Sequence, residues 1–318
     1  SSPLTCICTL MEDEFNATYI TLNGYVEVHK YSYVYFCIMF SAYTLIITSN
    51  SIIICLIWIH KNLHEPMYIF IAALLLNSVL YSTAFYPKLF IDVLSEKQII
   101  SYSACLFQYF IMYSLGGAEF LLLAAMSYDR YVSICKPLQY PTIMTKTNVS
   151  IFLFLAWFSA ACHFAGLTIL NAKTKLCNFS FKGVACNNVM YELHCVRSSV
   201  ITFYGVVALV DLVIFPLIFI VFTYIRIFII TYRSGREVRR KAAETCLPHL
   251  IVLISFSCLA VYDNVIARVE SSFPKTARLI MTLQIVLYHP LFNPLIYGLK
   301  MKEIYKHLKR LFCPARNI

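Results

Sequence analysis

Charged residues are scarce in this chain of 318 residues, since only 13% of them are Asp, Glu, Lys or Arg. Soluble domains of this size carry about 25% charged residues. Hydrophobic residues make up 60% of the sequence, and the mean hydropathy is +0.71. This shortage of charge argues against an ordinary soluble domain and predicts a chain dissolved in lipid.

The sequence also lacks the alternation of polar and apolar residues that marks membrane-spanning strands. Its apolar residues form continuous runs instead, and a helix needs about 20 such residues to cross the hydrocarbon core. Because a helix pairs its own backbone amides, runs of this length predict spanning helices. Seven runs are present, at residues 33–59, 67–87, 105–128, 149–172, 200–225, 245–262 and 279–299.

The predicted fold is therefore an all-α membrane protein, a seven-transmembrane helix bundle with a short amphipathic cytoplasmic helix. Residues 1–32 are expected to form an extracellular tail, residues 33–299 the bundle, and residues 300–318 the amphipathic helix and cytoplasmic tail. With this orientation most Lys and Arg residues lie on the cytoplasmic side, as the positive-inside rule requires. Membrane lipid then explains the net charge of +10, and nucleic acid is not an expected partner.

Several kinds of chemistry have no signature in the sequence. Paired carboxylates, a nucleophile motif and a phosphate-binding loop are all missing, so we expect neither an enzyme nor a cofactor. None of the eight histidines falls at a spacing that suggests a metal site. Internal repeats of the kind that build many transporters are not visible either.

Four cysteines on the predicted outer side fall in a pattern that invites pairing, and the oxidising environment there lets disulfides persist. They allow three connectivities, and spacing alone does not choose among them. Asn16 begins the sequence Asn-Ala-Thr in the tail and is the predicted glycosylation site. The four cysteines are Cys105, Cys177, Cys186 and Cys195.

Four stretches share a pattern with one known family. Residues 126–140 read MSYDRYVSICKPLQY, residues 63–68 LHEPMY, residues 241–250 KAAETCLPHL and residues 290–297 PLFNPLIY. They resemble the motifs MAYDRYVAICxPLxY, LHxPMY, KAxxTCxxHL and PxxNPxIY of vertebrate odorant receptors, which are rhodopsin-like G protein-coupled receptors. The LHEPMY stretch and the acidic residues after Met11 look most like fish members.

The resemblance implies a receptor that binds a small-molecule odorant within the helix bundle and activates a heterotrimeric G protein. That G protein would be the olfactory stimulatory type, which raises cyclic AMP. The expected location is the plasma membrane of olfactory sensory neuron cilia, with the N-terminus outside. A non-olfactory rhodopsin-like receptor for another small ligand or a peptide remains the alternative.

The motifs also imply which residues couple to the G protein and drive activation. Arg130 lies at a membrane boundary beside Asp129, which can hold it as an ion pair at rest. Pro294 removes a backbone hydrogen bond, and Asn293 is expected to offer its amide to the freed groups. The full set is Asp129, Arg130, Tyr131, Tyr224, His249, Asn293, Pro294 and Tyr297. The implied disulfides are Cys105–Cys186 and Cys177–Cys195.

The ligand pocket is expected beneath the outer loop. Gly116 and Gly117 either leave space for a ligand or serve close helix packing. Asp211 either faces the pocket or bonds to a neighbouring helix. Met112 stands where receptors for amines carry an aspartate, which disfavours an amine ligand. The predicted ligand-binding residues are Met112, Tyr113, Gly116, Gly117, Asp211, Asp263 and Asn264.

The chain departs from the family at one polar position. The second helix usually carries an aspartate where this sequence reads Asn77-Ser78, while Glu119 remains on the third helix. The two positions form a sodium site in related receptors. Glu119 is therefore kept as a candidate sodium ligand, with its usual partner missing.

Overall fold

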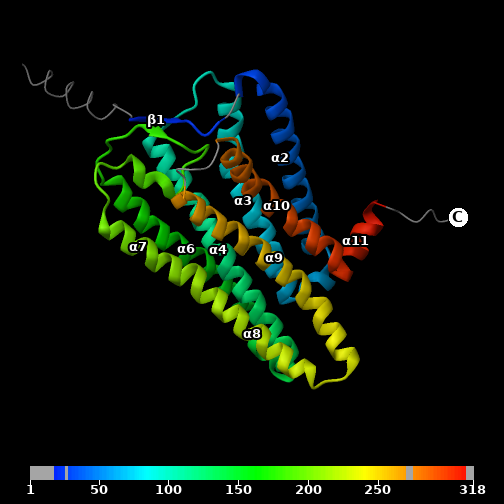
Figure 1. The fold of residues 1–318 in the computed structure, drawn as a ribbon. Coiled ribbons are helices and arrows are strands. Elements are labelled where there is room, and N and C mark those ends of the chain that lie inside the picture. Colours follow the sequence, from blue (N-terminus) through cyan, green and yellow to red (C-terminus); the bar gives the residue numbers. More distant parts are fainter. Residues whose placement is uncertain (1–17, 26–27, 270–274, 313–318) are drawn as a thin grey trace, which may run out of the picture.

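The computed structural model describes residues 18–25, 28–269 and 275–312. Within these residues the chain forms a bundle of long helices that lie side by side (Figure 1). Six of the helical segments are long and apolar enough to cross a membrane. The long helices are α2 (Val28–Ile59), α3 (Pro66–Leu94), α4 (Tyr102–Cys135), α6 (Lys146–Ala172), α7 (Ser199–Leu209) continued by α8 (Phe215–Tyr232), α9 (Arg236–Val269) and α10 (Lys275–Lys300).

The helices extend beyond the apolar runs from which they were predicted. Helix α2 already begins at Val28, inside the predicted tail, and α3 continues to Leu94. The run in α3 ends before Lys88, yet Lys88 forms an ion pair with Asp92 one turn later. Opposite charges four residues apart on a helix stabilise it, so these two residues continue the helix rather than end it.

A small sheet covers one end of the bundle, where Figure 1 labels β1. It consists of β1 (Tyr19–Leu22), β2 (Ile99–Ser101) and β3 (Ser180–Phe181), with β1 in the middle. Strand β1 runs antiparallel to β2 and parallel to β3. Its inward residues Ile20 and Leu22 are buried, as the two-residue period of a strand requires.

Two disulfides hold this end together. One joins Cys105 at the start of α4 to Cys186 in the loop before α7, and the other closes that loop between Cys177 and Cys195. These are the pairs that the resemblance implied. Ile20 packs in the same apolar cluster as Cys105 and Cys186. The sheet and the loop therefore form a lid, and we call this the lid end of the bundle.

Helix α11 (Lys302–Phe312) leaves the opposite end at an angle to α10 (Figure 1). Ile304 is fully buried against the bundle, whereas Tyr305 and Leu311 are exposed on the same helix. The ring of His307 stacks on His60, with 3.8 Å between centroids. This amphipathic helix thus has one side on the protein and apolar side chains left over for lipid.

The lid provides a test at Gly24, which follows β1. A Cβ atom at this position would lie 2.4 Å from the backbone carbonyl carbon of Gly183, so an alanine must push the loop away. We expect Gly24→Ala to lower stability by about 1–3 kcal/mol. Gly205→Ala is the matched control, because its Cβ would meet nothing within 4 Å. Thermal unfolding of both purified variants measures the difference, and equal melting temperatures would contradict a tightly packed lid.

Candidate functional site

The centre of the bundle contains a buried carboxylate. Glu119 on α4 is only 1% exposed, and its two oxygens are shared among side chains from other helices. Asn77 on α3 donates to Oε2 at 2.8 Å, and Asn293 on α10 donates to Oε1 at 3.2 Å. The His289 Nε2 atom lies 3.0 Å from Oε1. A carboxylate this deep needs such partners, because burial without them costs several kcal/mol.

Asn77 connects Glu119 to a third helix. Its Nδ2 donates to Glu119, while its Oδ1 accepts a hydrogen bond of 3.1 Å from the Trp157 indole on α6. An aspartate here would place two carboxylates side by side in a medium of low dielectric. The amide instead links three helices, because it donates to one neighbour and accepts from another.

Asn293 does not have the role that we predicted for it. The Nδ2 atom of Asn293 donates to Ser78 at 3.0 Å and to Glu119, not to the backbone freed by Pro294. Pro294 leaves the carbonyl of Pro290 without its helical donor. Asn50 on α2 fills that place, with Nδ2 at 2.9 Å from the Pro290 oxygen. The prediction missed Asn50 because only the folded chain brings α2 beside this carbonyl.

His289 is a further member of the centre that sequence reasoning missed. Its ring packs on Phe256 of α9, with 4.4 Å between centroids, while its Nε2 atom faces Glu119. The histidines were judged only for metal spacing. An ionisable residue inside an apolar run is a functional candidate by itself, and that rule would have found His289. In the described residues no group of three or more potential metal ligands comes together.

The end of the bundle opposite the lid holds the second polar group. Arg130 is buried with Asp129 and forms a hydrogen-bonded ion pair with it, in which Nε is 3.0 Å from Oδ2. Tyr140 in the following loop donates to the other oxygen, Oδ1, at 2.8 Å. Burial, followed by the Asp129 charge, raises the pKa of the Tyr140 hydroxyl, so this group stays protonated and donates. Both oxygens of Asp129 are thereby occupied.

Helices α8 and α9 meet near the same end through Tyr224 and His249. The Tyr224 hydroxyl forms a hydrogen bond with Nδ1 of His249. Tyr297 on α10 is 1% exposed and points its hydroxyl at the sulfur of Met126, 4.0 Å away. Tyr131 is partly buried against the same core. The structure therefore gathers the predicted activation residues at one end and along the axis of α10.

The predicted ligand residues of α4 lie below the lid. Met112 is 9% exposed, and the Tyr113 hydroxyl accepts a hydrogen bond of 3.1 Å from the backbone of Asn188 in the loop. The two glycines differ. A Cβ at Gly117 would meet Leu212 at 3.1 Å, so this glycine serves packing, whereas Gly116 has nothing within 4 Å.

Asp211 lies beside a neighbouring helix. Its carboxylate lies 3.6 Å from Nε2 of His163 on α6, and 53% of its side chain is exposed. It stands on a π-helical turn, Val210–Ile214, between α7 and α8. Asn16 and the side chains of Asp263 and Asn264 lie outside the described residues.

Comparisons with known proteins agree with this arrangement. A family model described as "Olfactory receptor" matches residues 36–315. Human olfactory receptor 6K3 is 32% identical over 98% of this chain and 95% of its own length. Human olfactory receptor 2T27 is 31% identical over 91% and 92%. The crystal structure of squid rhodopsin superposes with a TM-score of 0.69 at 20% identity and covers 88% of this chain and 81% of its own.

The buried centre generates a prediction for Glu119→Gln. The new amide turns one acceptor into a donor that faces other donors, so at least one buried group loses its partner. We expect a loss of about 1–3 kcal/mol. Ser114→Ala is the control on the same helix, because the buried Ser114 hydroxyl has no partner among the described residues. Thermal melting after purification compares the two, and an unchanged Glu119→Gln variant would show that the network does not stabilise the fold.

Proposed function

Because the chain belongs to the olfactory receptor family, we propose that it binds a small-molecule odorant within the bundle and activates a heterotrimeric G protein. It is a multi-pass membrane receptor with the rhodopsin-like seven-helix fold. The observation that carries the proposal is that the predicted ligand residues and the predicted G-protein residues lie at opposite ends of the bundle. At one end the disulfide-bonded lid covers the predicted ligand residues of α4, and at the other end Arg130 pairs with Asp129.

The orientation that we propose places the N-terminus outside the cell. The two disulfides and strand β1 lie at the same end, and disulfides persist in the oxidising exterior. Arg130 and the basic helix α11 lie at the other end, where anionic lipids of the inner leaflet attract Lys and Arg. The plasma membrane of olfactory cilia is the location that the family favours.

The proposed odorant site lies beneath the lid, beside Met112, Tyr113 and Gly116. Tyr113 connects this level to the loop through Asn188, so a ligand here would meet the lid directly. One turn further along α4, Glu119 links α3, α4 and α10. A ligand that favours a different spacing of these helices would shift the population of the bundle, which is the requirement for a switch.

At the opposite end three contacts hold the resting arrangement. Asp129 holds Arg130, the Tyr224 hydroxyl bonds to His249, and Lys302 of α11 reaches Glu244 of α9 at 2.7 Å. Outward movement of α9 breaks the last two contacts and opens a cleft beside Arg130. A released guanidinium can then bind the carbonyl oxygens at the C-terminus of a G-protein helix, which carry partial negative charge.

The first test is a cyclic AMP reporter in cells that express this chain with an olfactory-type stimulatory G protein. Fractionated fish-odour mixtures would supply the ligand. We expect a response that Arg130→Ala largely removes at equal surface expression, because the mutation deletes the group that meets the G protein. Direct activation of the cyclase checks the reporter in both cell lines. An undiminished response from Arg130→Ala would contradict this role of Arg130.

The same assay decides between the proposal and its alternative, a receptor for a non-olfactory ligand. A well-displayed receptor that stays silent to odorant mixtures but responds to a peptide or hormone fraction would support the alternative. Expression confined to olfactory neurons would favour the odorant.

Tyr140 offers a test of the resting state. Tyr140→Phe removes the hydrogen bond to Asp129 and leaves one buried carboxylate oxygen without a partner. Because this weakens the hold on Asp129 and its partner Arg130, we expect ligand-independent cyclic AMP to rise severalfold. Tyr128→Phe is the matched control, since the Tyr128 ring packs on Phe152 at 5.9 Å and keeps that contact. Equal basal signals would show that Tyr140 does not restrain Arg130.

A further inference from the structure

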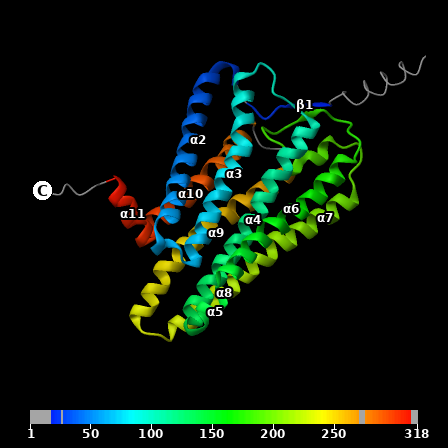
Figure 2. The same ribbon diagram turned by 180° about the vertical axis from the view of Figure 1, so that it is seen from behind.

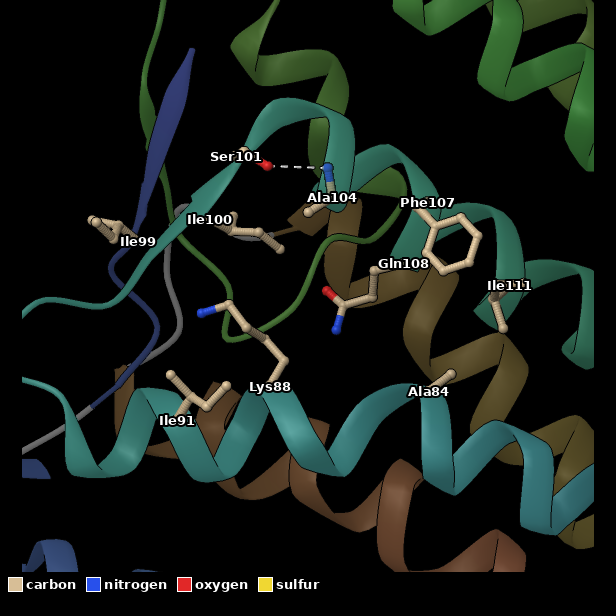
Figure 3. A pocket seen from close by; sticks show the side chains of 10 residues that line it. All are labelled: Ala84, Lys88, Ile91, Ile99, Ile100, Ser101, Ala104, Phe107, Gln108 and Ile111. Atoms are coloured by element: carbon tan, nitrogen blue, oxygen red, sulfur yellow. Dashed lines mark hydrogen bonds between the residues drawn. The ribbon is translucent and has the colours of Figure 1, made fainter. Parts of the chain in front are cut away.

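A groove separate from the proposed odorant site lies between α3 and α4 at the lid end (Figure 3). Its volume is about 390 Å³, within the usual range of small-ligand sites. Ile91, Ile111 and Phe107 contribute apolar walls, and the side chains of Ile91 and Phe107 are 60% and 65% exposed. Since these helices span the membrane, walls as exposed as these face lipid. A ligand can therefore enter from the bilayer.

Lys88 brings a positive charge into the groove. Its side chain is 22% exposed, while that of its partner Asp92 is 1% exposed. The Asp92 carboxylate also accepts a hydrogen bond of 3.2 Å from Tyr25, so it is enclosed on the protein side. The ammonium end of the pair is thus the accessible one.

Gln108 presents a second donor from the opposite wall. This side chain is 7% exposed, and its Oε1 accepts a hydrogen bond of 3.3 Å from the backbone of Cys186. Among the described residues its Nε2 atom donates to no partner. Figure 3 shows the Gln108 amide pointing into the groove from α4, while the amine of Lys88 rises from α3 on the side of Ile91.

The acceptors of the groove are already occupied. Ser101 lines it, but its hydroxyl caps α4 by accepting from the backbone of Ala104. The first turn of α4 also lies at the groove, and a helix N-terminus carries a partial positive charge. A ligand in this groove meets the Gln108 amide and the ammonium of Lys88, which it shares with Asp92.

Apolar residues line the groove on both sides of its polar groups. Ala84 and Ile111 stand further along the helices toward the bilayer centre than Lys88 and Gln108, while Ile91, Ile99 and Ile100 line the groove toward the lid. An amphiphile in the adjacent leaflet has its head at the boundary and its chain inside. A carboxylate has an acceptor oxygen for each of the two donors.

We propose that the groove between α3 and α4 binds a single-chain carboxylate amphiphile, a fatty-acid anion, taken up from the bilayer. The carboxylate binds Lys88 and Gln108, and the chain lies along Ala84 and Ile111 toward the bilayer centre. Because Gln108 also bonds to Cys186 in the lid, the bound anion stabilises the lid. The proposal rests on the membrane fold and not on the proposed odorant function, so a binding assay tests it without any G protein.

The test is photolabelling of the full chain in discs of phosphatidylcholine. The probe is palmitate with a diazirine on its chain. The control probe is the corresponding alcohol with the same diazirine, which carries no charge. We expect saturable labelling of α3 and α4 peptides by the acid, competed by plain palmitate. The alcohol should label about tenfold less, since it lacks the charge that the donors bind.

Variants define the site. Ala104→Phe fills the groove without changing its charges, and it should reduce labelling about tenfold. Lys88→Met combined with Asp92→Asn removes the ion pair as a unit, so no buried charge is left alone, and it should have the same effect. Lys97→Met is the matched control, because Lys97 is exposed at the same end and does not line the groove.

Three results would overturn the proposal. Labelling that is equal for acid and alcohol would exclude recognition of the carboxylate. Labelling that both groove variants leave unchanged would place the probe elsewhere. Protection by phosphatidylglycerol in the disc, as effective as protection by palmitate, would identify the occupant as a phospholipid.

Discussion

The bundle depends on a buried carboxylate that requires polar partners. Glu119 is almost fully buried, and burial of a carboxylate is costly unless other groups pair with it. Asn77 from α3 and Asn293 from α10 donate to it, and Nε2 of His289 on α10 lies 3.0 Å from one of its oxygens. The position of one acid thus fixes the spacing of three helices, and Trp157 extends the restraint to α6 through Asn77.

The two ends of the bundle are held together by different kinds of contact. At the lid end, covalent bonds and a small sheet hold the loop in place, and Figure 2 shows the same end from behind, with β1 across the helices. At the other end, hydrogen bonds and ion pairs connect Arg130 and α9 to their neighbours. Contacts of this second kind cost little to break when new partners are available, whereas the lid end stays closed. A signal from the lid can therefore change the far end while the lid keeps its structure.

Much of the fold could be predicted because the membrane leaves few choices. A run of apolar residues must form a helix, since its backbone amides have no other partners in lipid. The helix ends were harder to predict, because Lys88 and Asp92 continue α3 beyond the apolar run by pairing with each other. Strand β1 was missed for a related reason. Tyr19–Leu22 is short, and it pairs with two loops that lie far away in the sequence.

The sequence by itself determined that this chain spans the membrane, to which family it belongs and which residues are candidates for the switch, because composition and motifs are local properties. Tertiary structure alone decided what those residues contact. In the folded chain, Asn50 donates a hydrogen bond to the freed carbonyl of Pro290, and Asp211 lies near His163. Of the two neighbouring glycines, only Gly117 is packed against other side chains. Each outcome depends on the distance between helices that the sequence keeps far apart, and a hydrogen bond or a clash is decided within a few tenths of an ångström.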